Sequence, residues 1–255
     1  PMSNRILPWL TPVAFAGMVV VNVLANALPI GGMTTGALSA LYPNLFVPAG
    51  FTFSIWGVIY LLLGVFSVCQ LIRNQFMEET LHSVRPLFLL TCLSNAGWIF
   101  AWHYRLIGLS VLVMLVLLAA LILIHRRLYG QQPPDRRAFW CVRLPFSVYL
   151  GWISVATIAN ITALLVHLQW DGFGLGAAFW YGTMLAAAVL LALLMLWRHR
   201  DRAFALVVLW ALFGIAARHA GAGGALSAPP ALAPLCGAVV VLFGMGLSFR
   251  RRSQA

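Results

Sequence analysis

The sequence contains no lysine and only five acidic residues, and charged residues occupy 8% of its 255 positions. Hydrophobic residues make up 62% of the chain. A soluble domain with this composition would expose a mostly apolar surface, so the shortage of charge excludes a soluble protein. The chain is therefore predicted to be an integral membrane protein.

The shortage of acids also limits the chemistry that the chain can perform. Asp171 is the only carboxylate on its side of the predicted membrane, because Glu78, Glu79, Asp135 and Asp201 belong to loops on the opposite side. No two acids are therefore available for proton transfer within the bundle. No Ser-His-Asp pattern or phosphate-binding glycine loop occurs either, so ligand binding or sensing is favoured over catalysis.

Metal-binding patterns are missing as well. The four cysteines are scattered singly, without CxxC spacing, which predicts small core residues and neither a zinc site nor a disulfide framework. Each of the six histidines lies near a predicted helix end, where interface residues are more common than axial haem ligands. We expect no metal ligands and no required cofactor.

Long apolar runs dominate what is present. A run of about 20 residues crosses a hydrocarbon core of roughly 30 Å as a helix. Eight such runs predict an all-α polytopic bundle, and the seventh is the shortest. Their approximate ranges are residues 7–29, 48–73, 84–104, 106–125, 138–166, 174–197, 203–219 and 231–249.

The arginines predict how this bundle is oriented. With a cytoplasmic N-terminus, fourteen of the sixteen arginines fall on the cytoplasmic side, and only Arg105 and Arg218 fall outside. The positive-inside rule then predicts a multi-pass protein of the bacterial inner membrane with both termini cytoplasmic. The net charge of +11 is explained by topology and by attraction to lipid headgroups, with no nucleic-acid partner.

The loop over residues 29–47 carries no charge, although it is predicted to face water. Its glycines and threonines interrupt apolar residues such as Leu41, Tyr42 and Phe46. The loop is interpreted either as a lid that folds over a cavity or as a passive linker packed on helix ends.

Polar and aromatic residues inside three of the predicted helices point to an internal site. Pro145, Tyr149, Trp152 and Asn160 belong to the run Leu144 to Asn160, LPFSVYLGWISVATIAN. Polar groups in hydrocarbon need a partner or a cavity, so this helix is expected to face other helices or a ligand.

The second and third helices add similar residues. Trp56, Tyr60 and Gly64 recur at intervals of four on one helical stripe, and Asn95 lies one turn before Trp98. Such stripes are more often core packing than ligand contacts. Three converging helices with these residues would nevertheless enclose an aromatic, sparsely polar pocket suited to a large planar ligand.

Together these motifs resemble the TspO family, the translocator or tryptophan-rich sensory proteins. The run SIWGVIYLLLG from Ser54 to Gly64 is similar to that family's second-helix motif, Asn95 and Trp98 to its third, and the Leu144 to Asn160 run to its fifth. The resemblance covers about residues 7–168 and implies a five-helix core in residues 1–168, with a three-helix extension in residues 169–255. The loop departs from the family pattern, because Leu45 and Val47 stand where a tryptophan and a proline are usual.

The resemblance also implies a ligand and a site. Family members bind haem or protoporphyrin, and some bind sterols or drugs, so a small hydrophobic ligand is expected beneath the 29–47 loop. Trp56 and Trp152 match the tryptophans implicated in porphyrin breakdown and would be the catalytic residues if such an activity occurs. The predicted ligand-binding residues are Phe53, Trp56, Tyr60, Asn95, Trp98, Tyr149, Trp152 and Asn160.

The residues are also compatible with two other functions. The first is a secondary transporter for a small apolar substrate, although no acid lies in mid-membrane to couple an ion gradient. The second is a membrane subunit of a larger complex, because Gly174, Gly182 and Gly244 permit close helix contact in the extension. A homodimer is a further possibility for the partner.

Overall fold

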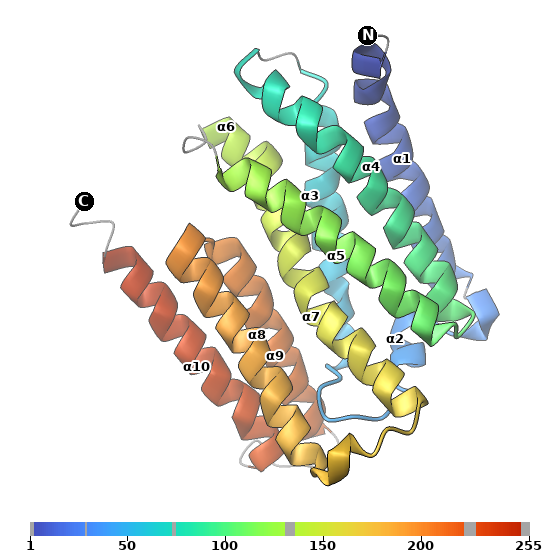
Figure 1. The fold of residues 1–255 in the computed structure, drawn as a ribbon, viewed down its shortest axis with the longest axis vertical. Coiled ribbons are helices and arrows are strands. Elements are labelled where there is room, and N and C mark those ends of the chain that lie inside the picture. The colour runs from blue at the N-terminus through green and yellow to red at the C-terminus, as the bar shows by residue number, and fades with distance from the viewer. Residues whose placement is uncertain (1–2, 29, 73–74, 131–135, 222–227, 251–255) are drawn as a thin grey trace. The chain divides into compact units, whose positions relative to one another are not determined.

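The chain forms an all-α structure in the computed structural model, which describes residues 3–28, 30–72, 75–130, 136–221 and 228–250. These residues contain no strand. The long helices are α1 (Ser3–Ala27), α3 (Ile55–Cys69), α4 (Gln75–His103), α5 (Ile107–Tyr129), α7 (Leu144–His167), α8 (Ala177–His199), α9 (Arg202–Gly221) and α10 (Pro229–Arg250) (Figure 1). The short elements are η1 (Ile30–Gly32), α2 (Thr35–Ser39), η2 (Gly50–Ser54), α6 (Arg136–Ala138), the π-helical η3 (Phe139–Arg143) and η4 (Gly172–Gly174).

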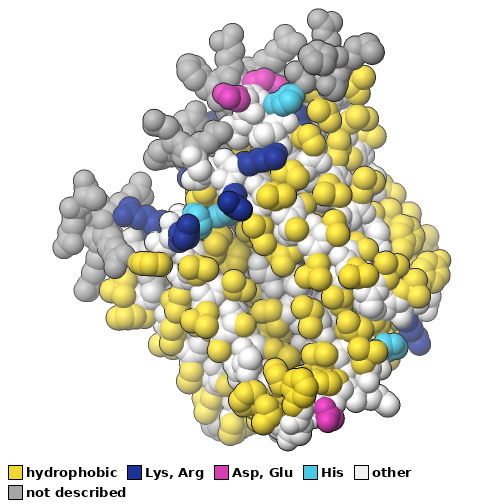
Figure 2. Space-filling view, viewed as in Figure 1, with side chains coloured by type: hydrophobic (Ala, Val, Ile, Leu, Met, Phe, Trp, Pro, Cys, Tyr) yellow, Lys and Arg dark blue, Asp and Glu magenta, His cyan; other side chains and the backbone are white. Residues whose placement is uncertain are grey.

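All eight predicted membrane spans are confirmed as helices among the described residues. Each is apolar and long enough to cross a bilayer, including the seventh span, Arg202–Gly221. Figure 2 shows hydrophobic side chains covering much of the visible face, with charged side chains gathered toward helix ends. The protein is therefore a multi-pass membrane protein, as its composition predicts.

The described helices form two compact units. Unit 1 comprises residues 1–38 and 55–153, and unit 2 comprises residues 39–54 and 154–255. This partition divides both the 29–47 loop and helix α7 between the units. These units do not coincide with the predicted domains, residues 1–168 and 169–255. That division stays a prediction.

Unit 1 is built on α4, which packs against both α1 and α5. Arg105 adopts a left-handed conformation (φ 57°) and turns the chain sharply between α4 and α5, as expected for a tight hairpin. Phe66, Phe88 and Phe146 fill the core of this unit, with ring centroids 4.8 to 5.8 Å apart and all three rings edge to face. This packing fixes α3, α4 and α7 relative to one another.

A buried polar cluster joins α1, α3 and α4 at one end of unit 1. Arg85 is only 2% exposed, and its Nε donates to Gln70 Oε1 at 2.8 Å. Its guanidinium also donates to both carboxylate oxygens of Glu78, at 2.5 and 3.3 Å. Gln70 Nε2 in turn donates to the Pro8 carbonyl at 2.7 Å. Gln70 and Glu78 thus supply acceptors to all three nitrogens of the buried guanidinium.

Unit 2 consists of α8, α9 and α10, the C-terminal part of α7 and the segment 39–54. Helices α8 and α9 both pack against α10 and against each other. The 39–54 segment is attached to α9, because Ala49 N donates to the Gly214 carbonyl and Trp210 Nε1 donates to the Thr52 carbonyl, each at 2.9 Å. His219 Nε2 also lies 2.8 Å from the Leu45 carbonyl oxygen.

The second half of the predicted loop is therefore tied to the C-terminal helices. This part of the loop, residues 39–47, belongs to unit 2, whereas residues 30–38 belong to unit 1. Pro29, where the predicted loop begins, lies outside the described residues. Tyr42, Phe46 and Val47 are buried, at 8%, 1% and 4% exposure, whereas Leu41 is 45% exposed, so only part of the apolar loop folds inward.

Candidate functional site

Four of the predicted ligand-binding residues meet in one aromatic cluster within unit 1. The Trp56 ring lies 5.5 Å from that of Tyr60, 6.1 Å from that of Tyr149 and 6.3 Å from that of Trp152, measured between centroids. Trp56 stacks on Tyr60, one helical turn away on α3, and meets the two α7 residues edge to face. The predicted convergence of the second and fifth spans is thus observed for these residues.

Asn95 joins this cluster through a hydrogen bond. Its Nδ2 donates to the Tyr149 hydroxyl at 2.8 Å, and its Oδ1 accepts from Asn22 Nδ2 at 2.7 Å. All three side chains are buried, with exposures of 6% or less. The amide of Asn95 is therefore occupied by helix-to-helix contacts between α1, α4 and α7.

The other three predicted residues are Trp98, Phe53 and Asn160. Trp98 stacks on Trp102 at 5.6 Å, and Trp102 Nε1 donates to the Thr35 carbonyl at 3.3 Å. Phe53 and Asn160 belong to unit 2. Tyr149 and Trp152 are almost completely buried, at 0% and 3% exposure, whereas Trp56 and Tyr60 are half-buried.

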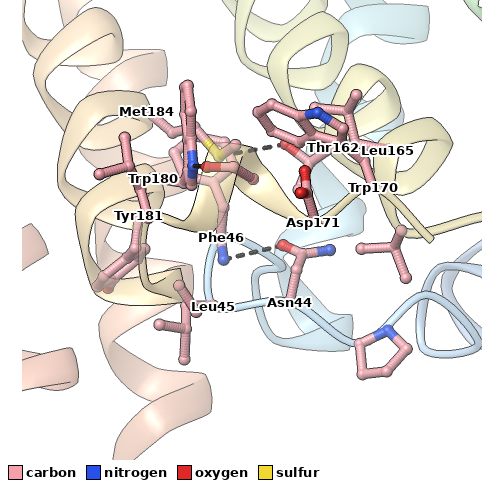
Figure 3. A pocket seen from close by; sticks show the side chains of 15 residues that line it. Asn44, Leu45, Phe46, Thr162, Leu165, Trp170, Asp171, Trp180, Tyr181 and Met184 are labelled. Atoms are coloured by element: carbon pink, nitrogen blue, oxygen red, sulfur yellow. Dashed lines mark hydrogen bonds between the residues drawn. The ribbon is translucent and has the colours of Figure 1, made fainter. Parts of the chain in front are cut away.

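Unit 2 contains a cavity of about 610 Å³ that the sequence did not predict at this place. One wall is the loop segment 43–46, and the other walls come from the end of α7, from residues 170–175 and from the beginning of α8. In the view of Figure 3, Asn44 and Leu45 lie on one side, and Thr162, Met184 and Trp170 lie on the other. A volume between 300 and 1,000 Å³ is typical of pockets that bind small molecules.

The walls of this cavity are largely apolar and aromatic. Trp170 and Trp180 lie with ring centroids 4.8 Å apart and their planes inclined by 59°. Trp180 Nε1 donates to the Gly172 carbonyl at 3.0 Å, which fixes its indole ring against the turn after α7. Gly172 has φ 66°, and a Cβ there would come within 2.9 Å of that nitrogen, so glycine is required for this contact.

The polar side chains that line the cavity are mostly engaged within the protein. Asn44 donates to the Tyr42 carbonyl and accepts from Phe46 N, at 2.8 and 2.9 Å. Thr162 donates to the Ile158 carbonyl at 2.8 Å. Tyr181 donates to the Pro230 carbonyl at 2.6 Å. These bonds hold the walls in place and leave Asp171 as the charged residue of the lining.

The sequence motifs did not predict Trp170, Trp180 and Tyr181 as site residues, because those motifs lie within the first five spans. One signal was available, since the sequence WDGFG at residues 170–174 follows the fifth span and faces the same predicted side as the uncharged loop. The sequence pattern does not say whether this segment and the uncharged loop come together in the folded protein.

No group of three or more histidines, cysteines or acids with metal-binding geometry occurs in the part of the chain that the structure describes. Two thiols nevertheless come together, because Cys69 Sγ lies 2.7 Å from Cys141 Sγ. These cysteines are 72 residues apart. Their separate positions in the sequence gave no indication of this contact.

The helices and the cavity define a class of protein, a multi-pass α-helical membrane protein with an aromatic-walled pocket. Comparison with known families then identifies the particular family. The chain belongs to the TSPO-like protein family, whose match covers residues 8–248. The match includes the three C-terminal helices, which the sequence resemblance had left outside its range. No curated protein and no solved structure matches the chain.

Proposed function

We propose that the protein binds a hydrophobic planar ligand in the cavity of unit 2 and acts as a receptor or carrier for it. The cavity of about 610 Å³ under residues 43–46 is the observation that supports this proposal. Trp170 and Trp180 offer flat apolar surfaces, and aromatic walls favour stacking with a planar ring system. Tetrapyrroles and sterol-like molecules are the ligand classes that the family resemblance suggests.

The proposal assigns the ligand to aromatic residues of unit 2 and not to the predicted cluster of unit 1. The Trp56 ring contacts those of Tyr60, Tyr149 and Trp152, so a ligand that inserted between these rings would have to displace them. The cavity requires no such displacement. Oxidative porphyrin breakdown by Trp56 and Trp152 stays a separate hypothesis, which would require the ligand to reach those rings.

A titration tests the proposed site. Purified protein in a neutral detergent is titrated with protoporphyrin and with haemin, and binding is followed through the absorption band of the ligand. Saturable binding is expected, and Trp180→Phe should weaken it about ten-fold through the lost stacking surface and indole hydrogen bond. Trp56→Phe serves as the matched control and should leave the affinity unchanged.

Other results would contradict the proposal in distinct ways. Absence of saturable binding by either ligand at micromolar concentration would contradict porphyrin binding. Loss of binding in Trp56→Phe or Trp152→Phe, with full binding in Trp180→Phe, would indicate that the ligand binds at the predicted cluster in unit 1.

The orientation of the chain is also a proposal. The arginine distribution supports cytoplasmic termini in a bacterial inner membrane, which would place the Asp171 turn and residues 43–46 on the outer side. Reporter fusions after residue 255 and within the 170–175 turn test this orientation. A cytoplasmic signal from the end of the chain and an external signal from the turn are expected, and the reverse pattern would contradict it.

A further inference from the structure

The charge in the cavity of unit 2 restricts the ligand that fits it. Asp171 is the one formally charged residue among the described residues that line the cavity. Its Oδ1 accepts from Phe173 N at 3.0 Å, which caps the short helix η4. A carboxylate accepts about four hydrogen bonds, so one backbone N–H leaves most of its accepting capacity available.

Among the described residues, no basic side chain forms an ion pair with this carboxylate, and the ion pair found there joins Arg85 to Glu78. His219 lies behind the wall, with Nε2 on the Leu45 carbonyl and its ring 5.7 Å from that of Tyr181. His167 lies against Tyr42 at 5.9 Å. Neither histidine lines the cavity.

The aromatic walls also favour a positively charged ligand, as the Asp171 carboxylate does. The faces of tryptophan and tyrosine rings carry negative electrostatic potential, which attracts cations placed within about 6 Å of the ring centroid. Trp170, Trp180 and Tyr181 all line the cavity that Asp171 borders. A carboxylate beside aromatic faces is a common arrangement for binding organic cations.

The other polar groups reinforce this preference, because they offer few free donors. The Asn44 amide, the Tyr181 hydroxyl and the Trp180 indole N–H already donate to backbone carbonyls. A ligand carboxylate would therefore meet an anion and find few donors to bind. A dicarboxylate porphyrin is therefore expected to bind this cavity, but more weakly than a planar cation of similar size.

We infer that the ligand of this cavity is a hydrophobic planar cation whose positive group lies beside Asp171, with its rings against Trp170 and Trp180. This inference rests on the proposed function, because it names the class of ligand for the same cavity. It also assigns a role to the one acid on the predicted outer side of the chain.

Two dyes with the same ring system and opposite charge provide the test. Rhodamine 6G is cationic, fluorescein is anionic, and both are built on a planar xanthene. Each dye is titrated by fluorescence anisotropy into the full chain in a neutral detergent at about 0.15 M salt, which limits long-range effects of the net positive charge. Rhodamine 6G should bind at least about ten-fold more tightly than fluorescein.

Asp171→Asn is the decisive variant, because asparagine keeps the oxygen that caps Phe173 N and removes only the charge. It should weaken rhodamine 6G binding about three- to ten-fold, since an exposed carboxylate gains modestly from pairing. Glu79→Gln is the matched control, because it makes the same change in charge at an exposed position on α4. Its affinity for rhodamine 6G should equal that of the unchanged protein.

The outcomes separate this inference from the proposed function. Saturable binding of both dyes with equal affinity would contradict the preference for a cation, but it would still show that the cavity binds ligands. An unchanged affinity of Asp171→Asn for rhodamine 6G would have the same meaning. Tighter binding of fluorescein would also contradict that preference. Absence of saturable binding by both dyes, together with absence of porphyrin binding, would overturn the inference and the proposed function together.

Discussion

Asn95 Nδ2 lies 2.8 Å from the Tyr149 hydroxyl oxygen and donates a hydrogen bond to it. The two residues are 54 positions apart, on α4 and α7, and Asn22 on α1 donates to the same amide. Three spans are therefore joined by polar groups that water cannot reach. Leaving a buried polar group without a partner costs more than an intact hydrogen bond contributes.

The first prediction concerns this network. Asn95→Leu should lower the free energy of unfolding by about 1–2 kcal/mol, because Asn22 and Tyr149 lose their shared partner. Tyr149→Phe removes only the hydroxyl and should cost less. Thermal unfolding of the detergent-solubilised variants measures both. Additive effects in the double variant would show that the two residues do not interact.

The second prediction concerns the buried Arg85. Gln70→Leu should destabilise unit 1 by about 2 kcal/mol, because it leaves buried guanidinium donors without their acceptor. Glu78→Gln should cost under about 1 kcal/mol, because the Glu78 side chain is 47% exposed and water screens its ion pair. Unfolding measurements that reverse this order would contradict the described geometry.

The third prediction concerns the thiol pair. Mild oxidation with copper phenanthroline should join Cys69 to Cys141, each thiol giving up its proton and one electron to the oxidant. The free thiols titrated in the denatured protein should fall from four to about two. Cys69→Ser is the control and should lose no intramolecular pair. An oxidised protein that retains free Cys69 and Cys141 would show that α3 and η3 are not in contact there.

The fourth prediction concerns the attachment of the 39–54 segment to α9. A Cβ at Gly214 would overlap the Thr52 side chain, so Gly214→Ala should destabilise unit 2 by about 1–3 kcal/mol. Gly182 on α8 has no such neighbour within 4 Å. Gly182→Ala should therefore be neutral or stabilising by up to about 1 kcal/mol, because alanine favours helices. Equal melting temperatures for the two variants would contradict this contact.

The positions of the eight spans could be read from the sequence, because apolar length alone specifies a membrane helix. The meeting of Trp56 with Tyr149 and Trp152 was also predicted, through spacing and family resemblance. The cavity could not be predicted, because it depends on how residues 43–46 fold against residues 170–184. The same is true of Cys69 and Cys141, since two single cysteines in apolar helices give no indication of how those helices are rotated.

The last prediction concerns the proposed position of the ligand in the cavity of unit 2. Photolabelling tests this position most directly. An apolar planar probe that carries a diazirine is bound to the full chain and irradiated, and its adducts are mapped by peptide mass spectrometry. Adducts are expected within residues 43–46 and 162–184, and an excess of unlabelled ligand should suppress them. Suppressible adducts around Trp56, Trp98 and Trp152, with none in the cavity segments, would contradict it.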